Sequence, residues 1–121
     1  MHQEIELIGN LGQTPELRTH NGRSVVNLNV ATNRRYNTEA GQVEETVWFN
    51  VAVWGNRADT CALYLRKGRQ VFVKGRMKAP KAFKRADGSY GASLDVDAQM
   101  VRFLGPKDEE ITVTSDLDDA E

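Results

Sequence analysis

The chain has 121 residues, of which 40% are hydrophobic and 27% charged, a composition that excludes wholesale disorder. The length is typical of one domain. No apolar run approaches the ~20 residues of a membrane span, and the N-terminus lacks the basic and apolar regions of a signal peptide. A single cysteine cannot form an internal disulfide, and two histidines with one cysteine do not make a usual zinc site. We therefore expect one soluble, cytosolic domain without a metal or cofactor.

The net charge of −1 hides an uneven distribution of charge along the chain. All 16 Lys and Arg lie in residues 1–107 with ten acidic residues, a net charge of +6. Residues 108–121 contain seven acidic residues and no basic residue. We expect a folded domain over 1–107 and an acidic tail over 108–121. A basic body favours a polyanionic partner, although the tail is also explained by solubility alone.

The first third of the chain predicts two strands. Ile5, Leu7 and Gly9 alternate with Glu4, Glu6 and Ile8, and the glycines of Gly9–Gly12 are expected to interrupt this strand. The pair Asn21-Gly22 predicts a tight turn into a second strand, Ser24–Asn33. The polar residues 37–44 predict a mobile connection to the next element.

The third strand is predicted over Glu45–Trp54, with valines and Phe49 on one face and Trp48 and Trp54 on the other. A helix follows, with Asn56 as the expected N-cap and an apolar stripe that includes Cys61. Arg66 and Lys67 suit its last turn and Gly68 its stop.

Two more strands are predicted, Gln70–Lys78 and Ser93–Leu104, joined by a loop that contains Asp87-Gly88. Three strands, a helix and two strands are the order of a five-stranded OB-fold barrel, an all-β fold, although a small open sheet with one helix fits nearly as well. Ile111 and Val113 are compatible with a short extra strand, but flanking acids favour a solvated tail.

Trp48 and Trp54 are the most informative residues, because only Asn50 and Ala52 separate them on their strand face. Nucleobases stack on exposed aromatic rings, so the pair is typical of a single-strand binding surface. Burial of both indoles against a neighbouring sheet or subunit is an equal alternative at this point.

Basic residues interleaved with aromatic ones favour a nucleic-acid ligand, since cations follow phosphates while aromatic rings take bases. They occur at the end of the second strand, along the fourth strand and in the loop after it. The candidates are Arg34, Arg35, Tyr36, Phe72, Lys74, Arg76, Lys78, Lys81, Phe83, Lys84 and Arg85.

Catalysis finds little support in the sequence. His2 and His20 are isolated, the serines have no nucleophile motif, and no phosphate-binding glycine motif is present. The carboxylate pairs Glu44-Glu45 and Asp95/Asp97 are explained by solvation at strand surfaces. We expect no catalytic residue, no metal site and no enzyme activity.

Several segments, in their order and spacing, resemble the bacterial-type single-stranded DNA-binding proteins: IELIGNLGQTPELR, NGRSVVNLNVATNRRY, EETVWFNVAVWG and YLRKGRQVFVKGRM. The resemblance spans most of residues 1–104. It implies an OB-fold that forms a homotetramer and binds single-stranded DNA without catalysis in replication, recombination and repair. It also implies a cytoplasmic, nucleoid-associated protein.

The stacking aromatics of that family match Tyr36, Trp48, Trp54 and Phe83 in this sequence, with Ala82 competing for the register of the last. Phe49 stands where many members have histidine. Members usually end in a long Gly/Pro/Gln-rich linker and an acidic tip whose terminal Pro-Phe docks partner proteins. Here the acidic stretch follows the domain directly and ends in Ala120-Glu121, so we expect weak or absent docking.

A specialised paralogue, or a phage or plasmid version, fits such a tail, which could instead compete with DNA for its binding surface. Two other classes of function stay open. A protein-interaction module, such as a primosome-type OB dimer, would bury the tryptophans in an interface. A small enzyme would depend on the carboxylate pairs.

Overall fold

The computed structural model describes residues 1–105 and 111–114. Its elements, in chain order, are β1 (Ile5–Leu11), β2 (Arg18–His20), β3 (Arg23–Thr38), β4 (Gly41–Trp54), α1 (Asn56–Tyr64), β5 (Gln70–Met77), β6 (Lys81–Lys84), β7 (Tyr90–Ser93), β8 (Asp95–Leu104) and β9 (Ile111–Thr114). Within the described ranges, no helix has the length and apolar character needed to cross a membrane.

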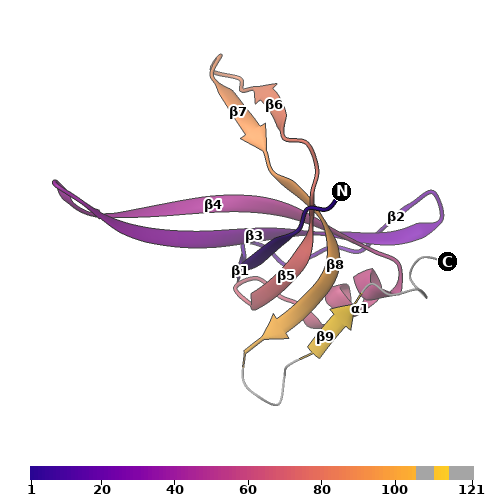
Figure 1. Ribbon diagram of the computed structural model, residues 1–121. Coiled ribbons are helices and arrows are strands. Elements are labelled where there is room, and N and C mark those ends of the chain that lie inside the picture. Colours follow the sequence, from indigo (N-terminus) through magenta and orange to yellow (C-terminus); the bar gives the residue numbers. More distant parts are fainter. Residues whose placement is uncertain (106–110, 115–121) are drawn as a thin grey trace.

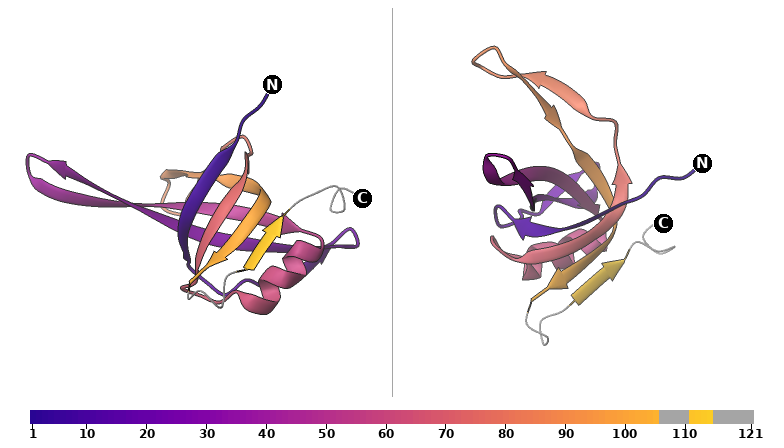
Figure 2. Two further views of the ribbon diagram at one scale, coloured as in Figure 1. Left: turned by 60° about the horizontal axis from the view of Figure 1, so that its bottom comes forward. Right: turned by 60° about the vertical axis from the view of Figure 1, so that its left-hand side comes forward.

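Five strands close into a barrel in the order β1-β5-β8-β4-β3, and β1 returns to β3 through the pairs Asn10–Ala31 and Leu11–Val30 (Figures 1 and 2). Neighbouring strands are antiparallel except β4 and β8, which run parallel. The helix falls between the third and fourth barrel strands in the chain. The expected barrel is therefore confirmed, and the open sheet is excluded.

The core fills the barrel with side chains from alternate strand positions, as the period of two predicts. Ala58, Cys61 and Leu65, from α1 and its C-cap, join the same cluster. The strand residues with no exposed surface are Val26, Leu28, Val30, Val51, Val53, Val71, Val73, Val96, Val101 and Phe103. The predicted division of the third strand into a valine face and a tryptophan face is thus confirmed, with Val51 and Val53 pointing inward.

Three local predictions near the barrel are wrong. β1 runs through Gly9 without a break, because a Cβ there would meet the carbonyl oxygen of Ala31 and only glycine lets the strands approach so closely. The helix takes Gly55 rather than Asn56 as its N-cap and has no side-chain cap. It ends at Tyr64, so Arg66 and Lys67 lie beyond its last turn.

The predicted mobile connection over 37–44 is also wrong. β3 and β4 stay paired out to Thr38–Gly41 and form a long two-stranded arm that leaves the barrel (Figures 1 and 2). The side-chain hydroxyl of Thr38 donates to the Gly41 carbonyl at 2.9 Å and ties the end of the arm. Continuous cross-strand hydrogen bonding outweighs the polar composition that suggested a loop.

Smaller strands surround the barrel. The Asn21-Gly22 turn is confirmed: both residues have positive φ, and they join β2 to β3. The expected loop around Asp87-Gly88 is the turn of a second projecting hairpin, β6–β7. Residues 111–114 form β9, paired with β8, where a solvated tail was favoured. The rest of the acidic tail lies outside the described residues.

Candidate nucleic-acid interface

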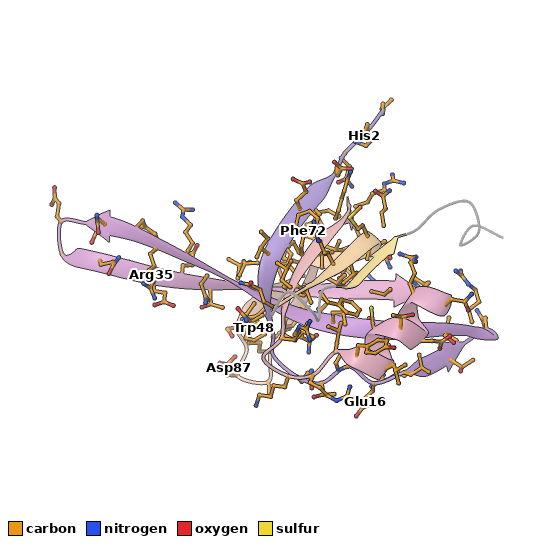
Figure 3. All side chains as sticks on the ribbon, turned by 90° about the horizontal axis from the view of Figure 1, so that it is seen from below. His2, Glu16, Arg35, Trp48, Phe72 and Asp87 are labelled. Atoms are coloured by element: carbon orange, nitrogen blue, oxygen red, sulfur yellow. The ribbon has the colours of Figure 1, made fainter. Side chains whose placement is uncertain are left out.

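The outward face of β4 carries both tryptophans, as the alternation predicted. Trp48 is 53% exposed and Trp54 is partly buried. Trp48 lies at the barrel end of the arm, while Arg35 lies far along it (Figure 3). The face therefore presents one widely exposed indole and one partly buried indole, six residues apart along β4.

Trp48 is positioned by the segment that follows β1. Gly12 lies beneath its ring, since a Cβ there would come within 2.5 Å of Cζ3 and 2.7 Å of Cη2. The Gly12 amide donates to the Asn29 carbonyl at 2.9 Å, which holds this segment on β3. The indole therefore rests on backbone and keeps its other side open.

Trp54 is supported by side chains that the sequence did not single out. The Arg23 guanidinium lies 5.2 Å from its ring centroid, and the His20 ring meets it edge-on at 6.0 Å. His20 is exposed, as expected, but it is not isolated from the tryptophan face, because the β2–β3 hairpin brings it back toward β4. A cation on the indole strengthens this cluster and adds positive charge at the edge of the face.

The arm holds Tyr36 with its two arginines, but the pairing of its strands offsets their charge. Arg34 lies over the Tyr36 ring at 5.1 Å and is directly opposite Glu45. Arg35 is opposite Glu44, with Nε 3.7 Å from the carboxylate. Tyr36 also faces the other side of the two-stranded ribbon from Trp48 by strand register.

The β6–β7 hairpin gathers the second aromatic–basic group. Phe83 is 46% exposed, with the Arg85 guanidinium 5.5 Å from its ring centroid. Lys81 and Lys84 are exposed, and within the described chain none of the three cations lies within ion-pair distance of a carboxylate. The sequence analysis did not select Tyr90, which is 72% exposed on β7 opposite Lys84. An aromatic residue shortly after Asp87-Gly88 was the available sequence signal for it.

The fourth barrel strand does not bring its candidates to the tryptophans. β8 separates β5 from β4, and Phe72 lies between Ile8 of β1 and Arg102 of β8, on a different part of the barrel surface. Lys74 pairs with Glu4 at 3.4 Å. Arg76 is exposed opposite Asp97, which also pairs with Lys78 at 3.6 Å.

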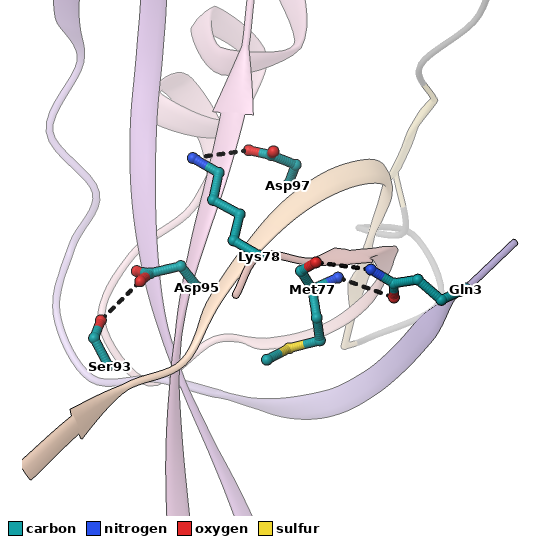
Figure 4. A network of polar contacts seen from close by, with 6 residues as sticks. All are labelled: Gln3, Met77, Lys78, Ser93, Asp95 and Asp97. Carbon is teal, nitrogen blue, oxygen red and sulfur yellow. Dashed lines mark hydrogen bonds and ion pairs between the residues drawn. The ribbon is translucent and has the colours of Figure 1, made fainter. Parts of the chain in front are cut away.

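The remaining candidates for chemistry have structural partners. Asp95 accepts a hydrogen bond from the Ser93 hydroxyl at 2.9 Å, while Asp97 pairs with Lys78 (Figure 4). Burial raises the pKa of the Cys61 thiol to about 12, so almost no thiolate forms at neutral pH. Among the described residues no group of side chains could hold a metal ion.

Comparisons with known proteins agree with this architecture. The single-strand binding protein family matches residues 2–104. "Single-stranded DNA-binding protein 1" of Chlorobaculum tepidum is 36% identical over 107 residues, covering 87% of this chain and 66% of the relative. A single-stranded DNA-binding protein of Neisseria meningitidis is 36% identical over 108 residues, covering 88% of this chain and 62% of the relative. The matched part is thus less than two thirds of either relative.

Solved structures share the fold. The small single-stranded DNA-binding protein from Streptomyces coelicolor has a TM-score of 0.66 and 27% identity, covering 82% of this chain and 91% of that one. The Plasmodium falciparum SSB, solved as a complex with ssDNA, has a TM-score of 0.72 and 25% identity, covering 87% of this chain and 96% of that one. The family match over residues 2–104, together with the five-stranded barrel and its single helix, shows that the chain belongs to the single-strand binding protein family.

Proposed function

We propose that this protein binds single-stranded DNA without catalysis and with little dependence on sequence. The observation that carries the proposal is the outward face of β4, where Trp48 and Trp54 lie on either side of Asn50, a residue that lines a hollow of about 380 Å³ on the barrel surface. Open indole faces suit unpaired bases, whatever the base, and duplex DNA does not offer its base faces.

Bases stack on Trp48, Trp54, Tyr36 and Phe83 in this proposal, and phosphates follow the cations around them. Lys81, Lys84 and Arg85 have the strongest support, because carboxylates lie near the arm arginines. Phe72, Lys74, Arg76 and Lys78 have weaker support, because they lie on β5 or directly after it and β8 separates that strand from β4.

Assembly and cellular role belong to the same proposal. Ile8 is 57% exposed beside the partly buried Phe72, and this apolar pair on the outside of β1 and β5 suits contact with a second copy. We propose a homotetramer that acts in the cytoplasm, at the nucleoid, in replication, recombination and repair. Sedimentation equilibrium tests the assembly, and a monomer at all concentrations would contradict it.

Tryptophan fluorescence during titration tests the binding proposal. Oligo-dT should quench the emission strongly, duplex DNA should not, and added salt should weaken the effect because binding releases counterions. Trp54→Ala should cost roughly 1–3 kcal/mol of binding free energy, one lost stack. Trp48→Phe and Trp54→Phe, each keeping an aromatic ring, assign the quenching to one indole.

A folded protein whose emission ignores oligo-dT would contradict the proposal. Filter binding or anisotropy with labelled oligonucleotide then decides whether DNA binds elsewhere or not at all. The latter result would favour a protein-interaction module with the indoles in its interface.

A further inference from the structure

The hollow on the tryptophan face is lined by hydrogen-bonding side chains aligned across three strands. Asn29 of β3, Asn50 of β4 and Asp95 of β8 occupy one row, because Asn29 is opposite Asn50 and Asn50 is opposite Asp95. On the same face of β4, this row lies directly beside Trp48 and is separated from Trp54 by Ala52. A base stacked on Trp48 would have these side chains within reach of its edge.

The charge of the hollow does not suit a phosphate. Its charged lining consists of Glu16, Arg18 and Asp95, and the Arg18 guanidinium lies 3.8 Å from Glu16. One negative charge therefore remains in excess, and an incoming phosphate would be repelled. The polar edge of a neutral base is the part of a DNA strand that fits there.

The donors and acceptors of the row are held in a defined order. The Asn50 amide donates to the Ser93 hydroxyl at 3.3 Å, and that hydroxyl donates to Asp95 Oδ2 at 2.9 Å. Ser93 thereby fixes the carboxylate, while the side chain of Asn29 makes no hydrogen bond within the described protein. The row offers a fixed acceptor, Asp95, at one end and the uncommitted side-chain amide of Asn29 at the other, with Asn50 held between them by Ser93.

We infer that this hollow is a base-edge subsite that takes a nucleobase with an exocyclic amino group, an inference that rests on the proposed function. An ionised carboxylate accepts hydrogen bonds only, and the N4 amino group of cytosine is a suitable donor. The ring acceptors beside that amino group suit the asparagine amides. Thymine has carbonyl oxygens on both sides of its single imino donor, and these oxygens face the Asp95 carboxylate unfavourably.

Oligo-dC and oligo-dT of equal length test the inference, since the two bases have the same ring size and differ at their edges. The wild-type protein and Asp95→Asn are titrated with both by fluorescence anisotropy. In the variant, the ratio of dC affinity to dT affinity should fall by at least about fivefold, the lower end of the discrimination from one base-edge pairing.

Asp97→Asn is the matched control. It removes the same charge from the same strand face, but Asp97 pairs with Lys78 rather than lining the hollow (Figure 4). Both variants should bind oligo-dT more tightly through the lost charge, and only Asp95→Asn should lose the relative preference for dC. Asn29→Ala, which breaks no internal hydrogen bond, should lower the same ratio and serves if Asp95→Asn does not fold.

An unchanged dC/dT ratio in Asp95→Asn and Asn29→Ala overturns the inference, as does an equal fall in Asp97→Asn. In both cases binding to oligo-dT itself persists, so the proposed function survives. Absence of binding to either oligonucleotide by the wild-type protein instead removes the proposed function, and the inference with it.

Discussion

The two hairpins that project from the barrel carry the same ingredients but differ in charge. Each places an arginine over an aromatic ring, Arg34 over Tyr36 in the arm and Arg85 over Phe83 in β6–β7. In the arm, strand pairing sets glutamates opposite both arginines. In β6–β7 the single carboxylate, Asp87, is turned onto Ser89 in its own tip. Cations with similar sequence surroundings are therefore not equally available to phosphates.

The largest expected effect separates the hairpins by charge. Replacing Lys81, Lys84 and Arg85 with alanine should lower the slope of log K against log[salt] by about 2, since a phosphate contact on a single strand adds about 0.7. Arg34→Ala with Arg35→Ala should change the slope by clearly less than the amount expected from the loss of two such contacts. Anisotropy titrations with oligo-dT over a salt series measure both slopes. Equal slope changes per residue would contradict the proposed difference in charge between the two hairpins.

The two hairpins should contribute similarly to binding through stacking of their aromatic rings on bases. Phe83→Ala and Tyr36→Ala should each cost about 1–3 kcal/mol of binding free energy, because each ring stays exposed beside its arginine and is able to stack on a base. Phe83→Tyr and Tyr36→Phe are the controls that keep the rings. If Tyr36→Ala leaves the affinity for oligo-dT unchanged while Phe83→Ala lowers it, the arm does not contact DNA.

Removing the glutamates should bring the arm closer to the other hairpin. Glu44→Gln with Glu45→Gln frees Arg35 and Arg34 from opposed charge, and affinity for oligo-dT at low salt should rise about twofold to fivefold, as expected for exposed ion pairs. Glu39→Gln, also on the arm, is the control for general charge. An equal gain per removed charge from Glu39→Gln would show that only net charge matters.

The smallest effect concerns the tip of β6–β7. Hydrogen bonds from the Ser89 hydroxyl and amide hold the pKa of Asp87 below its ordinary value of 3.8. A depressed carboxyl pKa stabilises the folded turn above pH 3.8, and this contribution is lost as the pH falls through the lowered value. The Ser89 amide resonance in NMR spectra should shift only as the pH falls below 3.8, the ordinary pKa of the Asp87 carboxyl, and Asp87→Ala should abolish the shift. A Ser89 resonance that titrates near pH 5 would contradict this.

Much of the barrel could be predicted because its signals are local. Alternation placed Val51 and Val53 inside and Trp48 outside, and the two residues of the Asn21-Gly22 turn have the positive φ that such a turn needs. The arm could not be predicted in this way. Its polar residues 37–44 resemble a loop by composition, and only their pairing with the opposite strand makes them a strand.

The aromatic residues and the side of each strand that they occupy follow from the sequence, because side-chain direction in a strand has a period of two. The groups around these aromatic residues depend on the fold. Strand register set Glu44 and Glu45 against the arm arginines, the β2–β3 hairpin brought His20 to Trp54, and barrel closure aligned Asn29, Asn50 and Asp95. These residues lie far apart in the chain, and hydrogen bonding between strands, which no local pattern encodes, brings them together.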